Sequence, residues 1–347
     1  MNIPKTAKRL ASFMEASEQE IVSLFQTIPN AQTLSTYSTK KPIIYVPGTR
    51  KDRVLLVAHN DTVFDKPAKV MQVGTWLMSA QAGVGIGADD RAGVCALWML
   101  RKLGHSLLIV PDEEVGCLGS TYAAENYADL LKDHSFMIQF DRAGATDLVY
   151  YDSETKEFEK YLETHFYPYS YAPGSFTDIV ELMPALDVAG VNISIGYYNQ
   201  HTAKESINIL EFIQTVYLSM HLLRQEKIPA FKPSPAYDYY GYSGYDWGYN
   251  RSSLYSSSCK KSGDTKDTEE EENPFESNLT SCELEEADVI ICPACKESHT
   301  DTFTDMYMMD WDEALCGFCN TMFAPVNHCF QIKGVTDDET NTYKAMS

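Results

Sequence analysis

The stretch VLLVAHND, residues 54–61, decides how this chain folds. Five apolar residues in a row are followed directly by a histidine, an asparagine and an aspartate. A short continuous apolar run is typical of a strand that is buried on both faces of a sheet. The polar residues mark the carboxyl end of that strand, where α/β proteins place their binding sites.

Similar apolar runs recur along the chain, and helical patterns separate them. Further strands are predicted at residues 43–46, 107–110, 136–140, 148–151 and 193–197. Residues 91–103, 122–131 and 206–223 carry apolar side chains at helical spacing, and the N-terminal residues resemble an amphipathic helix. The alternation predicts an α/β domain over residues 1–230, with a mostly parallel (mixed) sheet flanked by helices.

The composition excludes several classes of protein. The 347 residues include 49 acidic and 28 basic side chains, a net charge of -21, which argues against nucleic acid as a partner. No stretch has the length and apolarity of a membrane span. Lys5, Lys8 and Arg9 are not followed by the apolar run of a secretory signal. We therefore expect a cytoplasmic protein without disulfides. Of its nine cysteines, Cys95 and Cys117 lie inside apolar segments, and metal ligation is expected among the seven from Cys259 onward.

Acidic residues and histidines gather just after the predicted strands. A glycine-rich turn precedes Asp89, residues 107–110 lead to Glu113 and Glu114, residues 136–140 end at Asp141, and residues 193–197 lead to His201. Each could be an ordinary helix cap, solvated pair or hydrogen-bonded histidine. Because the carboxyl ends of parallel strands share one edge, we instead expect the whole set to converge on His59.

This set suits two divalent metal ions. Such ions lie roughly 3.5–4 Å apart and share a bridging carboxylate and a water. A ligand histidine usually has a carboxylate on its other ring nitrogen, and Asp61 is well spaced for that role beside His59. Of the neighbours Glu113 and Glu114, one could bind metal while the other accepts a proton from the water.

Five strings carry a resemblance to a known family: VAHNDTV (57–63), GIGADDRAG (85–93), PDEEVGCLGS (111–120), FDRAG (140–144) and NQHT (199–202). Together they resemble the co-catalytic zinc exopeptidase superfamily. Two of them, GADDRAG and PDEEVG, are very similar to the tripeptidase (peptidase T) branch, and DEEVGCLGS also resembles the lidless zinc aminopeptidases.

The resemblance implies a role for each residue. One metal would be held by His59, Asp89 and Asp141, and the other by Asp89, Glu114 and His201, with Asp89 as the bridge. Glu113 falls at the position of the general base and Asp61 at that of the residue that orients the histidine. Asp90 matches the second aspartate of the motif and is expected to cap the helix or shape the backbone.

One departure from the tripeptidase pattern concerns the lid. Those enzymes insert a lid and dimerisation domain between the last two ligands. Here 201 − 141 = 60 positions separate Asp141 from His201, room for a strand, a helix and another strand. The sequence thus predicts a zinc-exopeptidase-like architecture without a lid, whose specificity comes from loops such as residues 65–82 and 167–177.

Four further residues are weaker candidates. Tyr197 or Tyr198 could donate a hydrogen bond to a developing oxyanion, although strand-end packing explains them as well. Asp178 could meet a substrate amine or cap a helix. Arg142 could balance the charge of the carboxylates.

The last third of the chain has a different composition. Residues 231–288 are rich in Tyr, Ser and acidic residues and are expected to form a disordered linker, although the tyrosines could instead dock onto the catalytic domain. Residues 289–330 contain two C-x₂-C pairs separated by 20 residues, and residues 331–347 form a tail. This spacing predicts a zinc-ribbon module with one structural zinc on Cys292, Cys295, Cys316 and Cys319. The acidic flanks favour contact with protein, or self-association.

The sequence therefore predicts a metallo-exopeptidase, an aminopeptidase on short peptides, with two catalytic divalent ions (Zn, or else Mn or Co). A deacylase of N-acyl amino acids is the close rival, because the same superfamily covers both reactions. The alternative from another class is a non-catalytic scaffold that recruits a partner through the zinc ribbon.

Overall fold

A computed structural model of the protein describes residues 3–36 and 41–234, and the backbone alone of six short strands between residues 288 and 331. Its helices are α1 (Ile3–Met14), α2 (Glu18–Gln26), α3 (Ala88–Leu100), α4 (Leu118–Leu131), α5 (Lys156–His165), α6 (Asp178–Leu186) and α7 (Ile209–Leu223). The main sheet contains β1 (Gln32–Leu34), β2 (Ile43–Val46), β3 (Leu55–His59), β6 (Ser106–Val110), β7 (Met137–Arg142), β8 (Asp147–Val149), β9 (Ser170–Tyr171) and β10 (Gly190–Ser194).

The main sheet has the order β1-β2-β6-β3-β7-β10-β8-β9. Its four central strands, β6, β3, β7 and β10, are parallel, while β2 and β8 join them antiparallel on either side. The predicted α/β fold with a mostly parallel, mixed sheet is confirmed. Parallel alignment brings the carboxyl ends of the four central strands to one edge.

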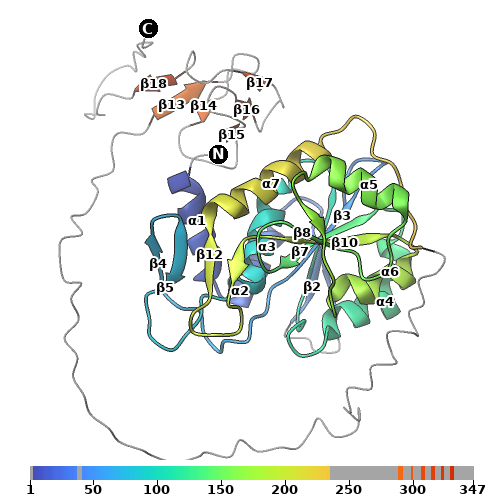
Figure 1. Ribbon diagram of the computed structural model, residues 1–347, viewed down its shortest axis with the longest axis horizontal. Helices are drawn as coiled ribbons and strands as arrows, with labels where there is room; N and C mark the ends of the chain where they lie inside the picture. Colours follow the sequence, from blue (N-terminus) through green and yellow to red (C-terminus); the bar gives the residue numbers. More distant parts are fainter. Residues whose placement is uncertain are drawn as a thin grey trace, which may run out of the picture.

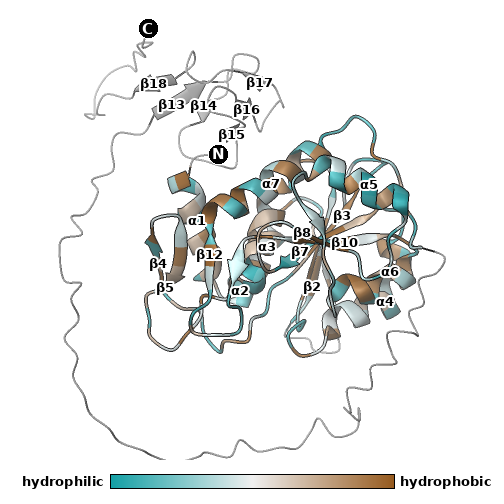
Figure 2. Cartoon of the chain, viewed as in Figure 1, coloured by the Kyte–Doolittle hydropathy of each residue, from teal (hydrophilic) through white to brown (hydrophobic). Residues whose placement is uncertain are grey.

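Alternating side chains on the strands pack into two separate cores. Leu56 and Ala58 of β3 belong to one core with residues of α1, α2, α3, α5 and α7. Leu55 and Val57 belong to the other, which α4 and α6 cover. A strand that is buried on both faces needs apolar residues at consecutive positions, which explains the unbroken run of β3. Figure 1 shows the two helical layers, and Figure 2 shows the hydrophobic central strands between them.

The amino ends of the central strands are closed by residues 225–234, which we call the C-terminal strap. Its Ile228 N–H donates to Asp52, its Phe231 N–H donates to the carbonyl of Ser135, and its Ser234 N–H donates to the carbonyl of Ser153. These bonds fix the strap to the end of the sheet opposite the histidine and acidic residues.

A second, four-stranded antiparallel sheet has the order β11-β12-β5-β4, built from β4 (Val70–Val73), β5 (Trp76–Ser79), β11 (Tyr197–Tyr198) and β12 (Ser206–Asn208). The sequence did not predict it. Residues 65–82, expected to be a loop, contain the β4–β5 hairpin. Residues 206–208, expected to begin a helix, pair with β5, and the helix starts only after the Asn208 side chain caps it at Leu210 N–H.

Positive φ angles correct two predicted strands. The strand predicted at 148–151 ends at Val149, since Tyr151 and Asp152 take φ angles of 56° and 61°. The strand predicted at 193–197 is divided by Gly196, whose φ is 90°, so β10 ends before it and β11 begins after it. Between Asp141 and His201 the chain forms two helices, α5 and α6, rather than one. Their connections are short, and no lid is present in this described stretch.

The described strands near the C-terminus form two small antiparallel sheets. One has the order β14-β13-β18, from β13 (Asp288–Ile291), β14 (Ser298–His299) and β18 (Cys329–Gln331). The other has the order β15-β16-β17, from β15 (Met306–Met308), β16 (Ala314–Cys316) and β17 (Met322–Phe323). Cys292, Cys295 and Cys319 of the predicted ribbon lie outside the described residues, and for Cys316 the backbone alone is described.

Candidate active site

The predicted site residues do meet at the carboxyl edge of the main sheet. His59 is the last residue of β3, Asp141 lies near the end of β7, and Asp89 stands at the start of α3. Glu113 and Glu114 follow β6, and His201 follows β11. Their side chains converge from five segments, as the parallel sheet predicts.

The Asp89 carboxylate lies between the two histidines. Its Oδ1 is 3.3 Å from His59 Nε2, and its Oδ2 is 3.3 Å from His201 Nε2. His59 Nε2 also lies 3.6 Å from Asp141 Oδ1, and His201 Nε2 lies 3.0 Å from Glu114. By these contacts the five residues form two groups, one around each histidine, and the groups share Asp89. A Glu114 oxygen also lies within 4.8 Å of ligand atoms of His59 and Asp89.

Asp61 connects His59 to the glutamate pair. One of its carboxylate oxygens is 3.3 Å from His59 Nδ1. The same carboxylate accepts hydrogen bonds of 3.2 Å from the backbone N–H groups of both Glu113 and Glu114. A carboxylate on the far nitrogen of a ligand histidine fixes the ring's orientation and tautomer. Asp61 therefore holds the His59 ring and the loop of Glu113 and Glu114 in fixed positions relative to one another.

Glu113 and Glu114 point to different parts of the cluster. Glu114 contacts His201, whereas Glu113 Oε2 lies 4.0 Å from His59 Nε2 and Glu113 Oε1 accepts from the Cys117 thiol at 3.6 Å. The Glu114 side chain therefore contacts the second group, whereas the Glu113 side chain lies beside His59 of the first group. The ligand role of Glu114 and the base role of Glu113 stay predictions.

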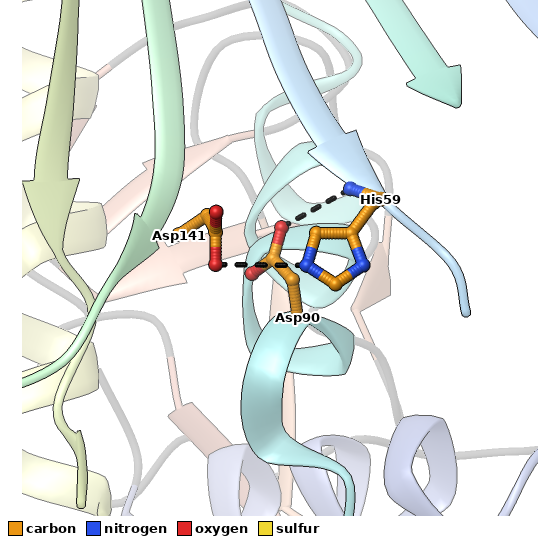
Figure 3. A group of neighbouring side chains, drawn as sticks. All are labelled: His59, Asp90 and Asp141. Atoms are coloured by element: carbon orange, nitrogen blue, oxygen red, sulfur yellow. Dashed lines mark hydrogen bonds and ion pairs between the residues drawn. The ribbon is translucent and has the colours of Figure 1, made fainter. Parts of the chain in front are cut away.

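Asp90 has a structural position within the cluster. Its side chain accepts hydrogen bonds from the N–H groups of His59, at 3.2 Å, and Gly93, at 2.9 Å. In the view of Figure 3 the Asp90 side chain is drawn between His59 and Asp141. Although Asp90, His59 and Asp141 are close enough to hold an ion, both oxygens of Asp90 already accept from backbone amides. Asp90 thus shapes the backbone around His59, the role that the sequence indicates.

Burial makes the negative charge of this cluster costly. Burial raises the pKa of Glu113 to about 9, that of Glu114 to about 7 and that of Asp141 to about 6. Burial alone would lower the pKa of His59, but hydrogen bonds with Asp141, Asp61 and Asp89 hold it well above its usual value. Several buried carboxylates around two imidazoles are a donor set that divalent cations fit, because the cations neutralise that charge.

A group of polar side chains that the sequence did not single out holds Asp141. Thr177 Oγ1 donates to its Oδ2 at 2.9 Å, and Gln139 Nε2 donates to the same oxygen at 3.2 Å. The Asn192 side chain accepts from the Asp141 N–H and donates to the Asp141 carbonyl. Gln139 and Asn192 interrupt apolar runs, which is the signal that could have revealed them.

The weaker candidates have other roles. Tyr197 donates to Asp141 Oδ1 at 3.2 Å, and Tyr198 donates to Glu211, so each hydroxyl already has a partner. Asp178 is fully buried and accepts from Gln139, away from any incoming amine. Arg142 pairs with Asp147 at 3.0 Å rather than with the cluster.

Glu205 is the other residue that the sequence analysis missed. It follows His201 by four positions, is 1% exposed, and accepts from the backbone N–H groups of Gly87 at 2.6 Å and Asp89 at 3.2 Å. It had no signal in the sequence, because its partners are backbone groups more than a hundred residues away.

The fold and the cluster define a class of protein: an α/β domain with a mostly parallel sheet and, at the carboxyl edge of that sheet, a two-centre cluster of histidines and carboxylates. Comparison with protein families gives the narrower assignment. Residues 43–181 match peptidase family M28. This match confirms, over residues 43–181, the predicted resemblance to the co-catalytic zinc exopeptidase superfamily, and it supports the use of divalent metal. No curated protein matches the chain.

Solved structures share the fold. The chain is similar to the aminopeptidase PepT from Bacillus cereus ATCC 10987, with a TM-score of 0.51 and 13% identity over 65% of this chain and 98% of that one. It is also similar to a tripeptidase from Staphylococcus aureus subsp. aureus Mu50, with a TM-score of 0.51 and 12% identity over 65% of this chain and 100% of that one. Among the described residues, no helix is long and apolar enough to cross a membrane.

Proposed function

We propose that the protein is an aminopeptidase that removes residues from short peptides at a site for two divalent metal ions. The observation that carries this proposal is the Asp89 carboxylate, which offers one oxygen to each histidine group at 3.3 Å. Two-metal hydrolases need a carboxylate in that position. The match to a peptidase family and the aminopeptidase and tripeptidase names of two structures with the same fold support peptide substrates.

The two groups of residues would each hold one ion. His59, Asp141 and Asp89 would bind the first, and His201, Glu114 and Asp89 the second. When bound, such ions polarise the scissile carbonyl and make a water more acidic. Zinc is the ion we propose, with Mn or Co as alternatives, because imidazole and carboxylate ligands suit all three.

Glu113 would move the proton. Its carboxylate lies 4.0 Å from His59, and Asp61 accepts a hydrogen bond from its backbone N–H. We expect it to take a proton from the attacking water and to pass that proton to the nitrogen of the leaving amine. Asp61 would hold His59 in orientation, and Thr177, Gln139 and Tyr197 would hold the Asp141 carboxylate.

A panel of free and N-blocked dipeptides and tripeptides tests the substrate class. An aminopeptidase should cleave the free peptides and leave the N-blocked ones intact. Cleavage of N-acyl amino acids alone would contradict the proposal and establish the rival deacylase. No cleavage of any compound by the metal-loaded protein would favour the scaffold.

We propose a separate zinc ribbon for the C-terminal residues, with Cys292, Cys295, Cys316 and Cys319 as ligands. The described strands support it. In the sequence, Cys292 and Cys295 fall between the antiparallel partners β13 and β14, Cys316 is the last residue of β16, and Cys319 falls between β16 and its antiparallel partner β17. We therefore expect about three ions per chain, two in the catalytic site and one in the ribbon. A chain with Cys292 and Cys295 both changed to Ser should lose one ion and keep hydrolysis.

We also propose a role for the ribbon, from the charge of the chain, and a cellular location, from its free thiols. An acidic chain with a zinc ribbon suits contact with another protein, or self-association, better than contact with nucleic acid. The buried thiols of Cys95 and Cys117 are unpaired, which fits a cytoplasmic protein in a reducing environment. We also propose the division into a catalytic domain at 1–230, a linker at 231–288, a ribbon at 289–330 and a tail.

A further inference from the structure

Glu205 connects two loops that carry proposed metal ligands. It lies four residues after His201 and is 1% exposed. Its Oε2 accepts from the Gly87 N–H at 2.6 Å, and its Oε1 accepts from the Asp89 N–H at 3.2 Å. One carboxylate therefore joins the His201 loop to the turn that presents Asp89.

The N-terminus of α3 explains why a carboxylate is needed there. The cap position of α3 is Gly87, which has no side chain and takes a left-handed conformation with φ of 63°. The backbone at Asp89 is also non-helical, with φ of −80° and ψ of 106°. The N–H groups of such a helix start have no partner within the helix. Glu205 caps them from a distant part of the chain, and its charge suits the positive end of the helix.

The cap also affects the position of the Asp89 side chain, because Glu205 accepts a hydrogen bond from the Asp89 N–H itself. Asp89 must direct one oxygen to each histidine group, at 3.3 Å on both sides. His201 is the most exposed of the predicted ligands, with 49% of its side chain accessible and a φ of 62°. Its loop needs an anchor to keep the ring in place, and the buried Glu205 is that anchor.

A role for Glu205 as a ligand does not fit the contacts. Both of its oxygens accept from backbone N–H groups, and the clusters of possible ligands in the described residues do not include it. Nor does its burial allow contact with a substrate.

We propose that Glu205 is a positioning residue that fixes the bridging Asp89 and His201 relative to one another, so that the second metal ion binds tightly. This inference rests on the proposed two-metal function. Loss of a group that orients metal ligands typically lowers affinity by about 10–100-fold. The effect should fall on the ion held by Glu114 and His201, since Glu205 anchors the His201 loop.

The test measures metal binding directly in the full-length protein. Metal-free protein is titrated with Co²⁺. The near-ultraviolet band of thiolate–cobalt charge transfer reports the ribbon alone, and the visible bands, after the ribbon's share is subtracted with the help of that band, report the histidine and carboxylate centre. Glu205→Gln keeps the size of the side chain but replaces one acceptor with an NH₂ group that faces a backbone N–H. We expect one of the two catalytic ions, the one that Glu114 and His201 hold, to lose about 10–100-fold in affinity, and kcat to recover at saturating metal.

Ser106→Ala is the matched control. Ser106 is also fully buried and accepts from a backbone N–H, that of Gly48 at 3.0 Å, but it lies at the amino end of β6, opposite the cluster. It should lower the melting temperature without changing Co²⁺ affinity. Equal loss of affinity in both variants would overturn the proposal, because a general loss of stability would then explain it.

Two other outcomes would also overturn it. One is a Glu205→Gln protein that binds both catalytic ions as tightly as the wild type. The other is a kcat that stays low when both sites are full. Glu205→Asp, which retains the charge on a shorter side chain, takes the place of the glutamine variant if that variant does not fold, and it should lose less affinity. Binding is measured without substrate, so the result stands even if no peptide is cleaved.

Discussion

Histidines are buried at both ends of the central strands, but their pKa values are shifted in opposite directions at the two ends. At the carboxyl end, His59 is completely buried among carboxylates, and its pKa lies well above the usual value, because hydrogen bonds with Asp141, Asp61 and Asp89 outweigh burial. At the amino end, His105 and His134 are buried against backbone carbonyls and a serine. There burial lowers both pKa values to about 4.

The difference separates a functional histidine from a structural one. Burial lowers the pKa of a histidine, because it disfavours the charged form of the imidazole. A buried histidine that only packs in a core is therefore neutral. His105 and His134 are bonded in that way. The carboxylates around His59 are a costly arrangement for a core, and a metal site accounts for them. A buried histidine therefore becomes informative only when its partners are known.

The largest effect should come from changing Glu113 at the carboxyl end. Glu113→Gln removes the group that moves the proton and keeps the shape of the side chain. We expect hydrolysis to fall by about 10²–10⁴-fold. Metal analysis should find the wild-type number of ions, since Glu113 is not a proposed ligand. Undiminished hydrolysis would exclude Glu113 as the base.

A second prediction concerns the amino end and acid. The unfolded chain takes up protons on His105 and His134 near pH 6.5, whereas the folded chain does so only near pH 4. The unfolding free energy should therefore fall as the pH decreases from about 6.5 to 4, by about 3 kcal/mol for each histidine.

Denaturant unfolding at several pH values measures this effect, and His134→Asn provides the comparison. The variant should lose stability less steeply than the wild type over this range. Parallel curves would mean that His134 does not titrate as its surroundings indicate. Taking the difference between the two proteins removes the contribution of metal release at low pH, which both share.

A third prediction links metal to stability at the carboxyl end. Ions that bind only the folded protein should raise the unfolding free energy, by about 2.7 kcal/mol at a concentration one hundred times the Kd. The increase is measured by thermal unfolding of the protein, with its catalytic site free of metal, in the presence and absence of added Zn²⁺. His59→Ala should abolish most of the shift, whereas Ser106→Ala should keep it. A shift of the same size in His59→Ala would place the stabilising ion elsewhere.

The smallest effect should come from Thr177→Val. This change removes the 2.9 Å hydrogen bond to Asp141 and keeps the shape of the side chain. Gln139 and Tyr197 still hold the carboxylate, so we expect less than about a tenfold loss of metal affinity. A larger loss would show that these contacts do not compensate for one another.

The sequence predicted those parts of the molecule that local pattern determines. Unbroken apolar runs located the buried strands, and the residues that follow them proved to share one edge. The β4–β5 hairpin escaped prediction because its strand Val70–Val73 is mostly exposed and carries no buried run. Residues 206–208 were assigned to a helix because Ile207 continues the apolar spacing of α7, although it pairs with Leu77 of β5.

The charged residues of the cluster were predicted better than the residues that hold them in position. Strand ends and motif strings identified the charged residues, because their chemistry is visible in the letters of the sequence. Glu205, Asn192 and Gln139 act through backbone amides or through another side chain, and such partners become visible only when distant segments meet. The orienting residues of a site are for this reason the hardest to find from one sequence.

The C-terminal strap also determines where the rest of the chain is attached. Its last described bond, from Ser234 to Ser153, lies past the end of β8 on the amino side of the sheet. Residues joined after Ser234 thus begin on the side of the domain away from the histidines and carboxylates. A fluorescent label, an affinity handle or an immobilising surface coupled at this point should leave the path of a substrate open, which makes Ser234 a practical place to attach a probe.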